Sequence, residues 1–121
     1  MNIDWAPLQA EFVKWRKKGL VLPIWWRDDD AVKDCPALDR LIALSVDVEV
    51  PVHLAIIPRK AEKSLVHRIG DEDAIVPLVH GWAHRNHAFT GRNRSEFPDS
   101  RSLSENRDEA AEGLRRLKQL L

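Results

Sequence analysis

The sequence predicts an α/β fold built on a parallel sheet. Three short, continuously apolar runs, at residues 20–26, 50–57 and 75–79, are typical of strands buried on both faces. Segments with helical spacing of apolar residues lie before, between and after these runs. Because buried strands alternate with amphipathic helices, we expect right-handed βαβ units in a sheet that is either open or part of a barrel.

The first two helices are predicted from their end signals. Asp4 and Pro7 can begin a helix that Gly19 ends, with apolar positions at Leu8, Phe12 and Trp15. Asp34 and Pro36 are expected as the cap and first-turn residue of the next helix. Its inward positions would be Leu38, Leu41, Ile42 and Ser45.

The second half of the chain is predicted to hold two more helices and a long loop. Residues 61–69 are predicted to form a short helix with Gly70 as its stop. Residues 85–101 are polar and lack periodicity, which indicates a long loop, and such loops in compact domains tend to be functional. Ser102 and Glu105 form a capping box for a last helix, whose apolar stripe would be Leu114, Leu117 and Leu121.

Composition limits the class of protein. With 121 residues, of which 44% are hydrophobic and 31% charged, we expect a single domain over residues 1–121 with one core. Nineteen basic residues balance nineteen acidic ones, so no overall charge draws the protein to nucleic acid or to an anionic membrane. One cysteine excludes an internal disulfide, and the polar N-terminus does not resemble a secretory signal. We therefore expect a cytoplasmic protein.

Two polar motifs follow the first and third apolar runs. Arg27-Asp-Asp-Asp30 comes after the first run, and His80-Gly-Trp-Ala-His84 comes after the third. Because the carboxyl ends of parallel strands meet at one edge of a sheet, we expect these motifs to lie together. Three adjacent carboxylates repel one another, and an Asp with two His is a plausible hydrolytic zinc arrangement. The alternative is a solvated turn in which an Asp caps a helix and the imidazoles are simply exposed.

The two motifs resemble those of a known family. Asp29-Asp30 and His80-x-x-x-His84 are similar to the first two motifs of the polysaccharide deacetylase (NodB-homology) family, written T-F-D-D-G and H-(S/T)-x-x-H. Residues 25–31 and 80–88 more closely resemble an uncharacterised bacterial subgroup of polysaccharide-deacetylase-like proteins. The resemblance implies part of a distorted (β/α) barrel that removes N- or O-linked acetyl groups from a carbohydrate with a divalent metal, zinc being the favoured ion.

The resemblance also implies roles for individual residues. By position, Asp29 would be the general base, and Asp30, His80 and His84 would bind the metal. The extra acid leaves a second register open, in which Asp28 is the base and Asp29 the ligand. The later pair is preferred because Ala31 then occupies the small-residue position that follows the pair.

Other polar and aromatic residues near the motifs are candidates for supporting roles. They would hold a ligand in place or contact substrate, and they are Arg27, Asp28, Trp82, His87 and Glu96. Trp82 could pack under the site or stack on a sugar ring. Loop packing and substrate contact are both open for Glu96.

The chain also departs from the family. The family's domain is longer, and its later motifs, which supply a substrate pocket and a general acid, are not found after residue 100. We therefore expect the N-terminal half of such a domain, inactive alone and prone to associate through exposed sheet edges. The alternative function is a non-catalytic deacetylase-like module that binds metal, sugar or a protein partner.

Overall fold

The computed structural model describes residues 2–121 and shows a mixed α/β fold. Its sheet contains β1 (Arg27–Ala31), β2 (Val52–Ile56) and β3 (Ile75–Val79), all parallel and in the order β1-β2-β3. The helices are α1 (Ala6–Lys17), α2 (Pro36–Val48), α3 (Lys63–Ile69) and α4 (Leu103–Leu120), and a 3-10 turn, η1 (Pro58–Lys60), precedes α3. The predicted element order and the parallel sheet are confirmed.

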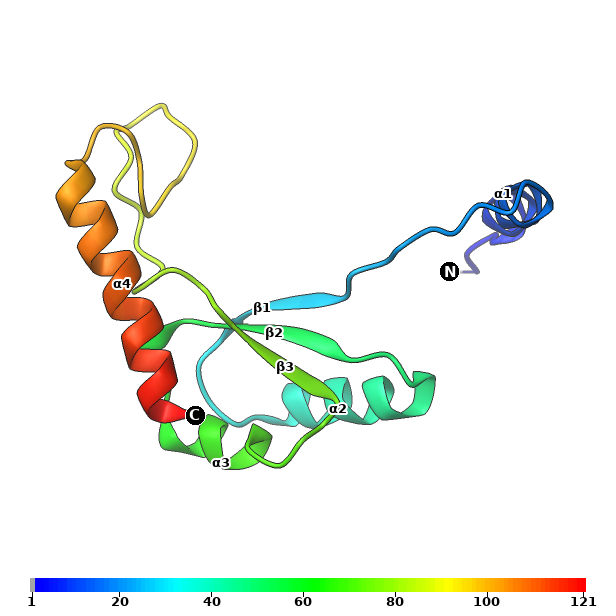
Figure 1. Cartoon of the computed structure of the whole chain (residues 1–121), viewed down its shortest axis with the longest axis horizontal. Helices are drawn as coiled ribbons and strands as arrows, with labels where there is room; N and C mark the ends of the chain where they lie inside the picture. Colours follow the sequence, from blue (N-terminus) through cyan, green and yellow to red (C-terminus); the bar gives the residue numbers. More distant parts are fainter. Residues whose placement is uncertain (1) are drawn as a thin grey trace.

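The hydrophobic core lies between the sheet and helices α2, α3 and α4. β2 is the central strand, and its alternate residues Val52, Leu54 and Ile56 are almost completely buried. They share one cluster with residues of α2, α3, β3 and α4, namely Leu38, Ile42, Leu65, Ile69, Ile75 and Leu117. Figure 1 shows α2 and α3 on the same side of the sheet. Each such buried side chain stabilises the fold by about 1.5 to 3 kcal/mol before entropy is counted.

The first strand lies later in the sequence than predicted. Residues 20–26 form no strand, and Val21 and Ile24 are 87% and 77% exposed. β1 consists instead of the acidic motif, so Asp28, Asp29 and Asp30 lie in the strand rather than after it. The reason is where the neighbouring strand starts. β2 begins only at Val52, after Pro51, and its second residue, His53, pairs with Arg27. Residues before Trp26 therefore have no partner strand.

Two other element boundaries differ from the predicted ones because of proline. The cap of α2 is Cys35, not Asp34, since a residue before proline favours extended backbone and Pro36 opens the helix. β2 begins at Val52 rather than at residue 50. Glu49, with φ +55°, is the C-terminal cap of α2, and Pro51 has no N–H to donate to a neighbouring strand.

The third helix begins at Lys63 rather than at residue 61. Residues 58–60 form the 3-10 turn, and both Ala61 and Glu62 have extended backbone before the helix starts. Gly70 is the C-terminal cap, as predicted.

The terminal helices differ in how they pack. α1 has no buried residue and lies apart from the sheet, beyond an extended segment (Figure 1). Of its predicted apolar stripe, Leu8 and Phe12 are exposed, at 45% and 39%, and Trp15 is partly buried. α4 has the predicted capping box and buries Gly113 and Leu117, whereas Leu114 and Leu121 are about half exposed. None of the helices found in residues 2–121 has the length and apolar character needed to cross a membrane.

Candidate metal centre

A bulge at the end of β1 positions Asp30. Arg27 and Asp28 pair with consecutive residues of β2, but the register then shifts before Ala31 pairs with Ile56. Asp30 takes up the shift with φ +69°, a left-handed conformation that aspartate tolerates better than most residues. Bulges of this kind commonly redirect a side chain near a functional site.

His80 directly follows β3, the strand on the other side of β2 from β1. Val79, the last residue of β3, is level with Ile56 of β2, and the His80 N–H donates to the Ile56 carbonyl at 2.8 Å. Asp30 and His80 therefore flank the carboxyl end of β2. This is the edge of the sheet where the two motifs were expected to meet.

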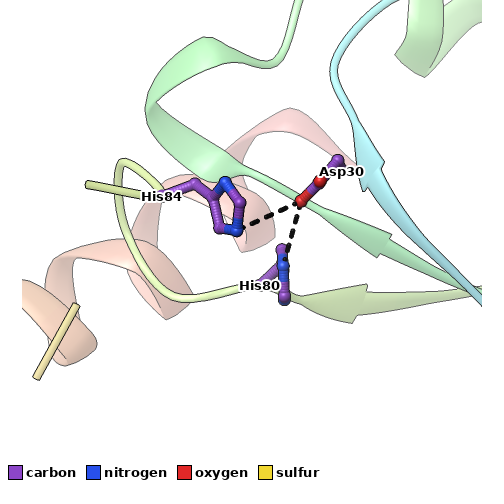
Figure 2. A group of neighbouring side chains, drawn as sticks. All are labelled: Asp30, His80 and His84. Carbon is purple, nitrogen blue, oxygen red and sulfur yellow. Dashed lines mark ion pairs between the residues drawn. The ribbon is translucent and has the colours of Figure 1, made fainter. Parts of the chain in front are cut away.

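The three predicted ligands lie together at this edge. Asp30 Oδ1 is 3.1 Å from His80 Nε2 and 3.4 Å from His84 Nε2, as Figure 2 shows. All three ligand atoms lie within 4.8 Å of one another, and residues 2–121 contain this one group of that kind. The imidazole rings of His80 and His84 are 5.0 Å apart between centroids.

The donor set fits a divalent ion. Tetrahedral zinc with bonds of 2.0 to 2.2 Å places neighbouring ligand atoms about 3.3 to 3.6 Å apart, close to the two Asp30–His distances of 3.1 and 3.4 Å. The side chains of Asp30 and His84 are 53% and 51% exposed, so one side of the group is open to solvent. Three protein ligands with an open side is the arrangement of catalytic rather than structural zinc sites.

Arg27 joins this group to Asp29. Arg27 Nε donates to Asp29 Oδ1 at 2.6 Å, and Nη2 lies 3.1 Å from His80 Nδ1. A guanidinium can only donate, so this second contact assigns the lone pair to Nδ1 and the proton of a neutral His80 to Nε2, facing Asp30. Metal binding through Nε2 requires the opposite tautomer, and Arg27 must then release His80.

The other two acids do not join the ligand group. Asp29 is held by Arg27 and is 52% exposed. Asp28 lines a cavity of about 310 Å³ between β1 and α2, together with Asp29 and Asp30. Of the three acids, only Asp30 lies close to both imidazoles, which is the arrangement expected for the later of the two registers.

The loop that carries His84 is held by Glu96. The Glu96 carboxylate accepts from the Trp82 N–H at 3.1 Å and from the Ala83 N–H at 2.6 Å. Gly81 turns the chain here with φ +62°, and His84 has φ +52°. The predictions included Glu96 but missed Gly81. The signal was present, because a glycine directly after a proposed ligand often marks a turn that other residues adopt poorly.

His87 and Trp82 have backbone roles in the described structure. The His87 N–H donates to the Ser95 carbonyl at 2.9 Å, which closes part of the long loop, and its ring is not in the ligand group. The Trp82 carbonyl accepts from the Arg59 N–H at 2.9 Å.

The far end of the long loop is fixed by an ion pair. Arg101 donates two hydrogen bonds, of 2.7 and 2.8 Å, to the Glu109 carboxylate on α4. This pairing lowers the pKa of Glu109 and raises the pKa of Arg101. Loop 85–101 is therefore bonded both to residues 80–84, through Glu96, and to α4, through Arg101.

The Asp and the two His thus form a candidate site for a divalent cation, with the Asp29 carboxylate on the residue before Asp30. This conclusion rests on the residues and their distances. Comparisons with protein-family models, curated proteins and solved structures found no match to this chain.

Proposed function

We propose that this chain is the metal-binding part of a hydrolase that removes acetyl groups from a carbohydrate. The observation that supports this proposal most is that Asp30, His80 and His84 meet at one end of a parallel sheet. Their ligand atoms lie within 4.8 Å of one another. The motif resemblance supports an acetylated sugar as substrate. The resemblance also supports a fold in which this sheet is part of a distorted (β/α) barrel.

The residues divide the chemistry between them. A divalent ion held by Asp30, His80 and His84 would acidify water and polarise the acetyl carbonyl. Asp29 accepts the proton from the attacking water, and the carbonyl carbon then loses the sugar nitrogen or oxygen. Arg27 holds the Asp29 carboxylate beside the ligand group through the 2.6 Å hydrogen bond. The proton that Asp29 takes from water then passes to the leaving nitrogen or oxygen, which departs as an amine or a hydroxyl group.

Metal binding is the first test. Zinc titrated into the chain, followed by calorimetry, should bind at one site, and Asp30→Ala and His80→Ala should each remove that binding. Asp73→Ala is the matched control, because Asp73 is an exposed acid before the amino end of β3, far along the strand from the ligands. Equal zinc affinity in Asp30→Ala and in the parent chain would refute the assigned site.

The base assignment has a separate test. In a protein that also carries the family's later motifs, Asp29→Asn should keep zinc and release acetate from an acetylated sugar at least about a hundred-fold more slowly. If Asp29→Asn loses zinc while Asp30→Ala keeps it, the earlier register is correct. Zinc binding with no acetate release from any acetylated sugar would favour the non-catalytic module.

A further inference from the structure

Glu96 makes contacts that are aimed at the segment between the two histidines. Its two carboxylate oxygens accept from consecutive backbone N–H groups, those of Trp82 and Ala83. Ala83 is only 8% exposed, so its N–H depends on Glu96 rather than on water. Both hydrogen bonds involve a charged acceptor, and such bonds are stronger than neutral ones.

Gly81 leaves the space that the Glu96 carboxylate occupies. A Cβ at position 81 would lie 1.9 Å from Glu96 Oε2 and 3.1 Å from its Cδ. On the other side, the Gly81 carbonyl packs against α4, where a Cβ on Gly113 would lie 2.3 Å from it. The segment is thus confined between Glu96 and α4, and neither glycine can gain a side chain without movement.

The two histidines are anchored differently. His80 directly follows β3 and is fixed by its hydrogen bond to Ile56. Within residues 2–121 the His84 backbone makes no hydrogen bond to the sheet, and its ring contacts only Asp30 there, at 3.4 Å. His84 is exposed and has a left-handed backbone conformation, which costs energy unless its surroundings impose it. The two residues before it are held by the hydrogen bonds from Trp82 and Ala83 to Glu96, and by the bond from the Arg59 N–H to the Trp82 carbonyl.

We propose that Glu96 is the positioning residue of the metal centre, which holds His84 at its distance from Asp30 and couples loop 85–101 to the ligands. The role in metal affinity rests on the proposed function, whereas the positioning of His84 does not. Groups that orient metal ligands typically contribute ten- to hundred-fold to metal affinity.

Zinc affinity of Glu96 variants tests the coupling. Glu96→Ala should weaken zinc binding about ten- to hundred-fold. Glu96→Gln should weaken it less, because the amide oxygen can still accept from one of the two N–H groups. Glu112→Ala on α4 is the control, since Glu112 pairs with Arg115 at the surface and should leave zinc affinity unchanged. Circular dichroism in the absence of metal should show that every variant is folded at the assay temperature.

Nuclear magnetic resonance without metal provides a second readout. In Glu96→Ala, the amide signals of Trp82 and Ala83 should move upfield as their hydrogen bonds are lost, and the ring signals of His84 should shift while the His80 amide stays in place. Replacing Gly81 with Ala should shift the same His84 signals, because its Cβ displaces the Glu96 carboxylate.

The outcomes separate the two proposals. If the parent chain binds zinc and Glu96→Ala binds it equally well, the positioning role is wrong while the metal site stands. If the parent chain binds no zinc, the proposed function fails, and the resonance data alone decide the role of Glu96. Unchanged His84 signals in Glu96→Ala would then overturn it.

Discussion

The backbone is unusual at the residues that carry the site. Asp30, Gly81 and His84 all have positive φ, between 52° and 69°. For the two residues that bear a side chain, this conformation costs about 1 to 2 kcal/mol each. Such conformations persist only where neighbouring structure imposes them, and they gather at functional sites. Here the bulge in β1 accompanies the first of them, and the hydrogen bonds from Trp82 and Ala83 to Glu96 lie between the other two.

Arg27 at Nδ1 and a metal ion at Nε2 would require opposite tautomers of His80, which leads to a prediction at the scale of the residue. Arg27→Gln should raise zinc affinity several-fold. It removes a positive charge from the site, and the glutamine oxygen can accept from Nδ1–H in the tautomer that binds metal through Nε2. Zinc affinity of the variant and of the parent chain can be compared by calorimetry at one pH and ionic strength.

The control for this prediction is Arg107→Gln, at a guanidinium that is 75% exposed on α4. Zinc affinity should not change in the control. If Arg27→Gln instead weakens zinc binding, Arg27 supports the ligands rather than competing for His80.

At the scale of elements, the sequence predicted those whose signals are local. β3 and the capping box of α4 lie where expected, because an isolated apolar run and a Ser-x-x-Glu pattern each specify one structure. The first strand was misplaced because its position depends on where β2 begins, and that is set by Pro51 far along the chain. Asp30 and the histidines could be predicted from strand ends. The bulge that turns Asp30 and the contact of Glu96 with the loop depend on tertiary pairing and could not.

The start of α4 should make stability depend on pH. Hydrogen bonds from Ser102 lower the pKa of Glu105, and those from Arg101 lower the pKa of Glu109, in both cases below the usual 4.5. A carboxyl whose pKa is lowered by folding stabilises the fold above its unfolded pKa, and this contribution is lost as pH falls through the folded pKa. The melting temperature should therefore be level from pH 7 to about 5 and fall below about 4.5.

Glu109→Gln is the informative variant for this prediction. It should melt at a lower temperature than the parent chain at pH 7, because Arg101 loses its charged partner, and the difference should shrink as pH falls to 3. A difference in melting temperature that stays constant between pH 7 and pH 3 would show that ionisation of Glu109 does not contribute to stability.

At the scale of the whole molecule, apolar surface is concentrated away from the core. Residues 20–26 and α1 together expose a series of large side chains, among them Leu20, Val21, Ile24 and Trp25. A 12-residue helix with no buried residue is marginal in water, so α1 adds little to the stability of the sheet. β1 and β3 are the outer strands of the described sheet, and unpaired strand edges and exposed apolar patches both favour association.

The exposed apolar side chains of residues 20–26, the extended segment, should therefore drive self-association of the isolated chain. Sedimentation velocity of the parent chain should show oligomers that grow with concentration in the micromolar range. Replacing Val21 and Ile24 together with Ser should reduce them, because these two side chains are the most exposed of the segment. The melting temperature should stay within about 2 °C of the parent value, since surface substitutions away from packed groups change stability by less than about 0.5 kcal/mol.

Val46→Ser provides the matched control, since Val46 is a 61% exposed residue on α2, away from the extended segment. It should leave association unchanged if residues 20–26 are responsible. If the parent chain sediments as a single monomer at every concentration, the exposed segment does not cause association. Equal association of the parent chain and the double variant would assign it to the edges of β1 and β3 instead, where the backbone rather than the side chains makes the contact.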